Sequence, residues 1–104
     1  MASSIKVRTS IHEGLTTVRM IIRHPMHTGF GVDEESGELI PAHYIKSVNV
    51  FHDKRPVIQC DWSRAVSRNP YLSFIFEGAE AGDTLSIHWE DNMGKTDSAE
   101  VTIE

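Results

Sequence analysis

Hydrophobic and polar residues alternate along most of this chain, which is the pattern of β-strands that bury one face. The pattern is clearest in the second half, where the alternating residues are mostly aromatic or aliphatic. Seven segments are predicted to be strands on this basis: residues 5–10, 16–23, 44–52, 56–62, 71–76, 85–90 and 99–103. The first of them carries the weakest signal.

The alternation also predicts which side chains face the core. In the second segment, Val18, Met20 and Ile22 share one face, and Ile21 is an apolar residue on the other. In the third segment, Lys46 interrupts the apolar face. The inward positions expected elsewhere are Tyr44, Val48, Val50, Ile58, Cys60, Trp62, Leu72, Phe74, Phe76, Leu85, Ile87, Trp89, Ala99, Val101 and Ile103.

Turn residues separate the predicted strands at short intervals. Asn and Gly in residues 91–95 favour the positive φ angles of a tight hairpin. Residues 61–70 are predicted to form one helical turn that Asn69-Pro70 ends, and residues 24–41 form a long loop. Seven short strands with regular turns predict an all-β fold, an immunoglobulin-like antiparallel β-sandwich. Residues 1–104 are expected to form a single domain.

Composition and charge exclude several classes of partner. The chain has 104 residues, of which 10 are Lys or Arg and 15 are Asp or Glu, so its net charge is −5. This balance argues against nucleic-acid binding, which requires a basic surface. No apolar run approaches the roughly 20 residues of a membrane-spanning helix. Cys60 is the only cysteine, so no intramolecular disulfide can form.

Histidine is the residue type that offers candidate metal chemistry. His24 and His27 are three residues apart, a spacing found in metal sites. Together with Cys60, the chain's six histidines could form a mononuclear iron centre such as that of superoxide reductases. However, Cys60 lies on the predicted inward face, and His88 is predicted to point outward next to Trp89. We therefore predict no metal and no cofactor, with a histidine-ligated redox protein as the alternative.

No catalytic constellation is evident in the sequence. Gly29-Phe30-Gly31 lacks the further glycine and the helix of a dinucleotide site. Glu90 and Asp91 are adjacent on a predicted strand, so they should point to opposite faces. We expect both to lie at a solvated hairpin end. The chain is therefore predicted not to be an enzyme.

Several short motifs carry a resemblance to a known family, and the resemblance extends from about residue 5 to residue 103. These motifs are His24-Pro25-Met26 followed by Thr28-Gly29, then Ile40-Pro41, Asn69-Pro70-Tyr71-Leu72-Ser73-Phe74, and Trp89 ahead of a turn that ends at Gly94. In this order and spacing, the chain resembles the SoxZ family of bacterial sulfur-oxidation proteins. It departs from the family pattern at His27, where an acidic residue is expected, and at Phe30-Gly31-Val32, where a basic pair is expected.

The resemblance implies a role in thiosulfate oxidation. SoxZ proteins are non-catalytic immunoglobulin-like subunits that pair with SoxY, whose C-terminal cysteine carries the sulfur intermediates. The resemblance thus implies a heterodimer or a dimer of heterodimers, with transient contacts to other Sox enzymes. The N-terminus shows no export signal, so the resemblance further implies a periplasmic location reached by co-export with SoxY.

The partner surface is predicted from the expected exposure of apolar residues and from the motif of the long loop. The predicted partner-binding residues are His24, Pro25, Met26, Phe30, Tyr71 and Ile75. An alternative hypothesis is a free-standing interaction module that binds an unrelated protein through Ile21, Ile75 or Phe30.

Overall fold

Seven strands in two antiparallel sheets make up the computed structural model, which describes residues 4–63 and 65–104. In chain order these strands are β1 (Ile5–His12), β2 (Leu15–Ile22), β3 (Ile45–His52), β4 (Arg55–Asp61), β5 (Tyr71–Glu77), β6 (Thr84–Asp91) and β7 (Thr96–Thr102). All seven predicted strands are confirmed. The described residues contain no helix, and hence none long and apolar enough to cross a membrane.

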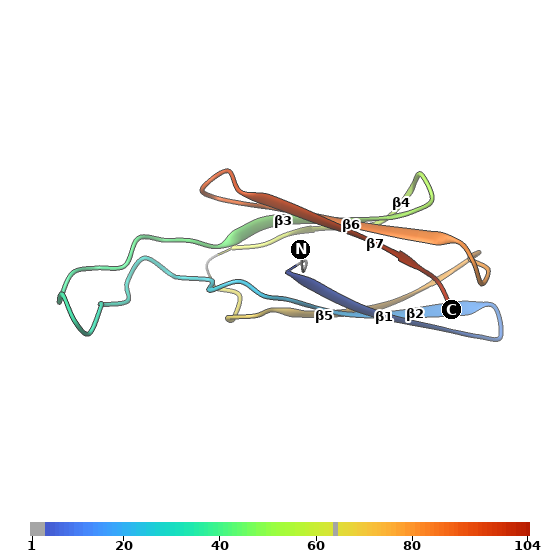
Figure 1. The fold of residues 1–104 in the computed structure, drawn as a ribbon, viewed down its shortest axis with the longest axis horizontal. Helices are drawn as coiled ribbons and strands as arrows, with labels where there is room; N and C mark the ends of the chain where they lie inside the picture. Colours follow the sequence, from blue (N-terminus) through green and yellow to red (C-terminus); the bar gives the residue numbers. More distant parts are fainter. Residues whose placement is uncertain (1–3, 64) are drawn as a thin grey trace.

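The two sheets face each other as the layers of a β-sandwich (Figure 1). One sheet has the strand order β1-β2-β5, and the other has the order β4-β3-β6-β7. Hairpins join β1 to β2, β3 to β4 and β6 to β7, whereas the β2–β3, β4–β5 and β5–β6 connections cross between the sheets. This arrangement confirms the predicted immunoglobulin-like sandwich.

The core lies between the sheets and consists of the side chains that the alternation pattern predicts. Val18, Met20 and Ile22 of β2 are buried, and they face Leu85 and Ile87 from the opposite sheet. Full burial of one such side chain stabilises the fold by roughly 1.5–3 kcal/mol. The interleaved apolar faces therefore account for the two-layer architecture.

A β-bulge explains why Lys46 interrupts the alternation of apolar and polar residues in β3. The pairing of β3 with β6 shifts register between Ile45 and Ser47. The extra residue lets Ile45 and Val48 both face the core while Lys46 remains exposed. The strand begins at Ile45, so the prediction that Tyr44 is part of it is wrong.

The predicted helical turn between β4 and β5 is wrong for the residues that the structure describes there. The N–H of Val66 donates to the carbonyl of Ser63 at 3.2 Å, which closes one isolated turn. The hydroxyl of Ser63 accepts the N–H of Ala65, a side-chain bond that competes with helix formation. Residue 64 of the predicted turn lies outside the described residues.

The predicted long loop is an extended excursion, here called the arm (residues 24–43), that leaves β2 and returns to β3. It projects beyond one end of the sandwich (Figure 1), and the molecule measures 53 × 24 × 19 Å. Isolated antiparallel bridges join His27 to His43 and Val32 to Leu39. The arm is therefore a narrow, irregular hairpin.

Local interactions shape the arm along its length. At its tip, Asp33 Oδ1 accepts the N–H of Glu35 at 2.8 Å and that of Ser36 at 3.1 Å. Near its base, Gly29 has a φ of +92°, and a Cβ there would lie 3.2 Å from the Cβ of Ala42. Glycine is thus required where the two limbs of the arm come together.

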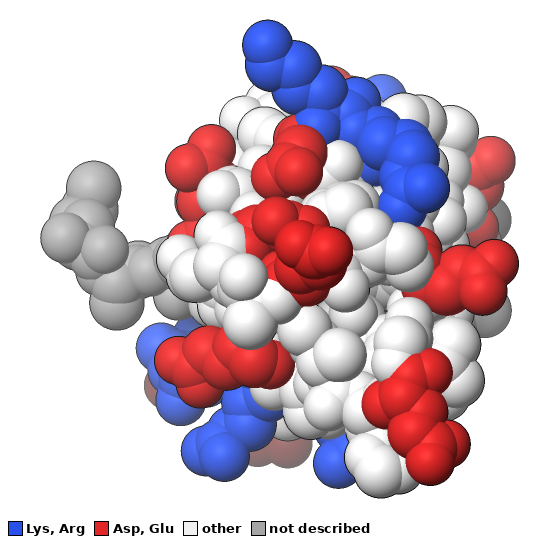
Figure 2. All heavy atoms as spheres, turned by 90° about the vertical axis from the view of Figure 1, so that its right-hand side faces the viewer, with Lys and Arg blue, Asp and Glu red and all other residues white. Residues whose placement is uncertain are grey.

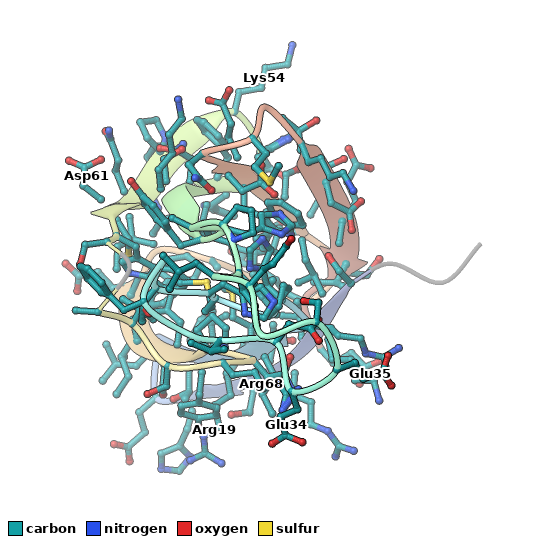
Figure 3. All side chains as sticks on the ribbon, turned by 90° about the vertical axis from the view of Figure 1, so that its left-hand side faces the viewer. Arg19, Glu34, Glu35, Lys54, Asp61 and Arg68 are labelled. Carbon is teal, nitrogen blue, oxygen red and sulfur yellow. The ribbon has the colours of Figure 1, made fainter. Side chains whose placement is uncertain are left out.

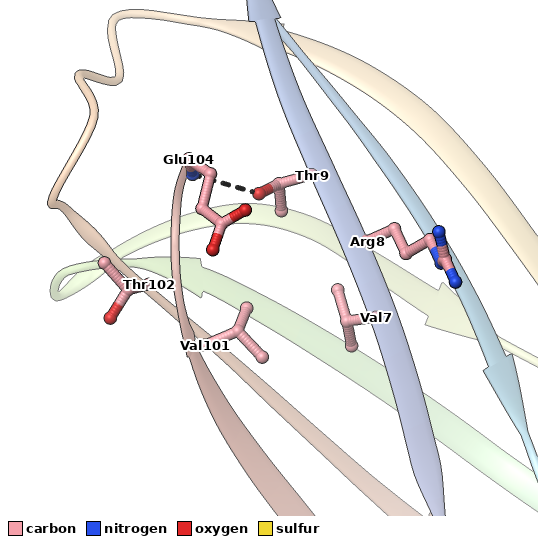
Figure 4. A pocket seen from close by; sticks show the side chains of 6 residues that line it. All are labelled: Val7, Arg8, Thr9, Val101, Thr102 and Glu104. Atoms are coloured by element: carbon pink, nitrogen blue, oxygen red, sulfur yellow. Dashed lines mark hydrogen bonds between the residues drawn. The ribbon is translucent and has the colours of Figure 1, made fainter.

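The sandwich is closed along one side by contacts between the edge strands β1 and β7. The N–H of Glu104 donates to Thr9 Oγ1 at 3.3 Å, and Val7 and Val101 line the groove between the two strands (Figure 4). At the other end of β1, Asp97 Oδ2 accepts the hydroxyl of Ser4 at 2.6 Å. The end of the sandwich opposite the arm mixes acidic and basic side chains (Figure 2).

Candidate functional site

The base of the arm contains a His–Asp–His cluster made of His24, His43 and Asp91, in which His24 and Asp91 are buried and His43 is half-buried. Nε2 of His43 lies 2.7 Å from Asp91 Oδ2, and Nε2 of His24 lies 3.2 Å from the same oxygen. Asp91 ends β6, His24 follows β2, and His43 precedes β3. One carboxylate therefore ties both ends of the arm to the four-stranded sheet.

Hydrogen bonds hold Asp91 in its ionised form. Its second oxygen, Oδ1, accepts the N–H of Met93 at 3.0 Å and that of Lys95 at 2.9 Å. Burial alone would raise the pKa of Asp91, but the bonds from both histidines and both backbone amides outweigh burial and lower it. The carboxylate thus accepts four hydrogen bonds in a fully buried position.

The tautomer of His24 follows from its two neighbours. The N–H of Met26 donates to Nδ1 of His24 at 3.1 Å, so Nε2 must carry the proton that the ring donates to Asp91. Burial lowers the pKa of His24, and the hydrogen bond to Asp91 offsets this only in part. The ring also packs edge-on against His43 and Trp89. His24 is therefore a neutral, structurally fixed imidazole.

This arrangement does not fit a metal ion, although the three side chains offer a ligand set of suitable type. A metal would need the lone pair of His24 Nε2, which would move the ring proton to Nδ1, against the Met26 N–H. Ligating histidines instead donate their second N–H to an acceptor. The ring protons of the two histidines are instead used in hydrogen bonds to Asp91.

A second histidine cluster is formed by His52, Asp53 and Asp83, and hydrogen bonds occupy its imidazole in the same way. Nε2 of His52 lies 2.8 Å from Asp83 Oδ2, and Arg55 Nη2 donates to His52 Nδ1 at 3.2 Å. Both ring nitrogens are again occupied by hydrogen bonds. This cluster ties the β3–β4 hairpin to the β5–β6 connection and does not fit a metal either.

Two of the family-like motifs, the one that begins at His24 and the one that begins at Asn69, meet beside the His–Asp–His cluster. The N–H of His24 donates to Asn69 Oδ1 at 3.0 Å, and the N–H of Asn69 donates to the carbonyl of His24 at 2.9 Å. The N–H of Ile22 donates to the carbonyl of Pro70 at 3.0 Å. Met26 and Asn69 both adopt positive φ angles. These motif residues therefore fix the base of the arm.

The cluster predicts a specific pH dependence of stability. Because the pKa of His24 is lowered from its ordinary 6.5, the unfolded chain binds more protons than the folded chain at acidic pH. The free energy of unfolding is expected to fall as the pH drops below about 6.5. A second fall is expected below about 3.8, because the pKa values of Asp91 and Asp83 are also lowered.

Urea unfolding at a series of pH values measures both transitions. A His24→Gln variant should be less stable than the parent at neutral pH and should lose the first decline while keeping the second. A parent whose stability does not change between about pH 7 and pH 5 would contradict the assigned protonation state of His24.

One sequence prediction about this region is wrong: Asp91 was expected at a solvated hairpin end, but it is fully buried. His24, noted in the sequence for its metal-type spacing from His27, lies instead against His43, and His27 meets His43 through the backbone. The reason is long-range strand pairing, which aligns Ile45 with Asp91.

The six residues predicted to bind a partner divide between exposed and buried positions. Phe30, Tyr71 and Ile75 are exposed by 73%, 58% and 61%, as expected. His24 and Met26 are buried, so the exposure expected for Met26 is wrong. Sδ of Met26 accepts a hydrogen bond from the backbone N–H of Ile45, with 3.3 Å between sulfur and nitrogen. Pro25 is half-buried, Phe30 lies on the arm, and Tyr71 and Ile75 lie on the outer face of β5.

Cys60 is half-buried and packs against the core, as its position in the alternation predicts. Burial, followed by the neighbouring charge of Asp61, raises the pKa of its thiol. A raised pKa keeps the sulfur in the unreactive thiol form.

Comparison with protein families gives one match, which extends over nearly the whole chain. Residues 5–102 match the family described as "Sulphur oxidation protein SoxZ". No curated protein sequence matches the chain.

Solved structures with a similar fold come from other proteins. A hypothetical protein from Pyrococcus horikoshii OT3 has a TM-score of 0.69 at 16% identity, covering 96% of this chain and 87% of that one. A superoxide reductase in the oxidised state has a TM-score of 0.67 at 15% identity, covering 98% and 88%. The superoxide reductase (neelaredoxin) from Archaeoglobus fulgidus has a TM-score of 0.64 at 15% identity, with the same coverage. At these identities the likeness establishes the fold alone.

Proposed function

The chain belongs to the SoxZ family and is therefore a Sox-system subunit, and we propose that it is the non-catalytic scaffold of a sulfur-carrier complex. In this proposal it binds a SoxY-like protein, whose C-terminal cysteine carries the sulfur intermediates of thiosulfate oxidation. The family match over residues 5–102 is the observation that carries the proposal.

The chemistry of the chain supports a scaffold role. The buried histidines and carboxylates are occupied by hydrogen bonds to one another and to the backbone. The single cysteine is half-buried in a strand, and its pKa is raised. A sulfur carrier needs a reactive thiolate that can reach several enzymes, and Cys60 meets neither requirement.

The fold also supports a role in presenting a surface. The His–Asp–His cluster fixes both ends of the arm, which carries Phe30 and projects beyond the end of the sandwich (Figure 1). Tyr71 and Ile75 are exposed on the outer face of the three-stranded sheet. Both regions offer apolar surface for a partner, in line with the aromatic and apolar anchors of protein interfaces.

The division of labour between the two chains can be tested with a Cys60→Ser variant. When the complex with a SoxY-like partner is charged with thiosulfate by the Sox enzymes, mass spectrometry should find sulfur adducts on the partner alone. The variant should support thiosulfate oxidation at the parental rate, because this thiol takes no part in the chemistry. Sulfur adducts on Cys60, or loss of activity in a folded variant, would contradict the scaffold role.

We also propose that the pair works in the periplasm and reaches it by co-export with the partner. Fractionation of cells that express both chains should find this chain in the periplasm only when the partner carries an export signal. Periplasmic accumulation without the partner would contradict this route.

A further inference from the structure

The outer faces of the two sheets differ in chemistry. The four-stranded sheet presents mainly polar side chains to solvent, including Asn49, Ser86, His88 and Glu90. The outer face of the three-stranded sheet, here called the β1-β2-β5 face, presents large apolar side chains instead. Its exposed apolar residues are Leu15, Ile21, Tyr71 and Ile75. Exposed apolar patches of this kind mark interaction sites.

Cations accompany the apolar residues on this face. The strand register places Lys6 of β1 opposite Ile21 of β2, and Tyr71 of β5 lies on the other side of Ile21. In the next row, Arg8 of β1 is directly opposite Arg19 of β2. Like charges in directly opposed positions destabilise a sheet. The free chain therefore carries an unfavourable arginine pair on its surface.

Nothing in the described parts of the chain, residues 4–63 and 65–104, neutralises this pair. Neither Arg8 nor Arg19 makes an ion pair there, although the net charge of the chain is −5. Arg19 projects outward from the sheet (Figure 3), and Arg8 points away from the groove between β1 and β7 (Figure 4). Both guanidinium groups are available to a carboxylate from outside.

A shallow hollow of about 280 Å³ connects the two features. It is lined by Lys6, Arg8 and Arg19 together with Ile21 and Tyr71. Val7, Met20, Ile21 and Tyr71 give this hollow an apolar lining beside its three basic residues. The hollow therefore suits an apolar side chain whose neighbours carry negative charge.

We propose that the β1-β2-β5 face docks a partner protein surface with an apolar centre and a carboxylate that bridges Arg8 and Arg19. This inference rests on the proposed function, and the partner is the SoxY-like chain. Charge complementarity carries the choice of occupant, since a carboxylate would turn a repulsive pair into a bidentate, charge-assisted contact.

A second copy of this chain is a poorer occupant of the face. Two-fold pairing with its axis at the hollow would bring the arginines of both copies together and add to the repulsion. A small anion could neutralise the arginines but would leave Ile21, Tyr71 and Ile75 uncovered. A partner surface with both apolar and acidic groups satisfies the whole face.

Charge reversal at Arg19 separates a docking role from a structural one. In an Arg19→Glu variant, the new carboxylate faces Arg8, so the thermal midpoint of the free chain should rise. Affinity for the SoxY-like partner should fall at least tenfold, because the variant repels the partner's carboxylate. A Lys54→Glu variant, altered at the β3–β4 hairpin, is the matched control and should bind like the parent.

Isothermal titration of the purified partner into each variant distinguishes the outcomes. Parental affinity in Arg19→Glu would overturn the docking face while leaving the proposed function intact. Failure of the parent itself to bind would overturn both proposals. A dimer that the parent forms alone, and that Arg19→Glu or Ile75→Asp alters, would assign the face to a second copy and overturn the choice of partner.

Discussion

An Asp91→Ala variant is expected to be about 3–5 kcal/mol less stable than the parent, because four hydrogen-bond donors at the base of the arm lose their common acceptor. The substitution leaves the Nε2–H groups of His24 and His43 and the backbone N–H groups of Met93 and Lys95 without their acceptor. Donors left unsatisfied in buried or partly buried positions are costly, and four depend on this one side chain.

Chemical denaturation of Asp91→Ala beside a neighbouring carboxylate variant measures this effect. Glu90→Gln is the matched control, since Glu90 makes only a partly exposed pair with Lys46 at 3.7 Å. Its effect should remain within about 0.5 kcal/mol. Equal stability losses in the two variants would show that the His–Asp–His cluster contributes no more to stability than an exposed ion pair does.

Removal of Tyr71 is expected to weaken partner binding about 30-fold, which corresponds to about 2 kcal/mol. Tyr71 is exposed in the free chain and lies at the end of the apolar row with Ile21. Aromatic side chains at the centre of an interface contribute disproportionately to affinity. Because its side chain points outward, Tyr71→Ala should leave the stability of the free chain nearly unchanged.

A second exposed apolar residue provides the control for Tyr71. Met93 is exposed by 58% in the β6–β7 hairpin, away from the β1-β2-β5 face. A Met93→Ala variant should bind the partner like the parent in the same titration. Similar losses from both substitutions, or none from Tyr71→Ala, would contradict the role of this face.

The sequence predicts the sandwich well because each strand carries its own evidence. The alternation in β5 and β6 directly gives the inward set that includes Leu85 and Ile87. The errors occur where local pattern does not determine structure. The bulge near Lys46 depends on pairing with β6, and the segment after β4 depends on side-chain bonds of Ser63.

The His–Asp–His cluster could not be predicted from local sequence pattern, because it also depends on long-range strand pairing. His24 and His43 lie at the two ends of the arm and Asp91 ends β6, and only the pairing of β3 with β6 brings the three together. Asp91 followed by Asn92 gave a turn signal, and the turn exists, but its carboxylate also reaches two distant histidines. The exposure of Tyr71 and Ile75 was predictable because parity within one strand decides it.

Hydrogen bonds among the His–Asp–His cluster fix the backbone at the base of the arm. The β1-β2-β5 face carries apolar and basic side chains, and among the described residues Arg8 and Arg19 make no ion pair. We propose that a SoxZ-family chain organised in this way binds a carrier subunit through its exposed surface.

Sedimentation velocity of this chain mixed with a purified SoxY-like protein, both folded and at micromolar concentration, tests that claim most directly. We expect a stable complex containing equal numbers of the two chains, as a heterodimer or a dimer of heterodimers. Two separate boundaries at the positions of the individual proteins would contradict it.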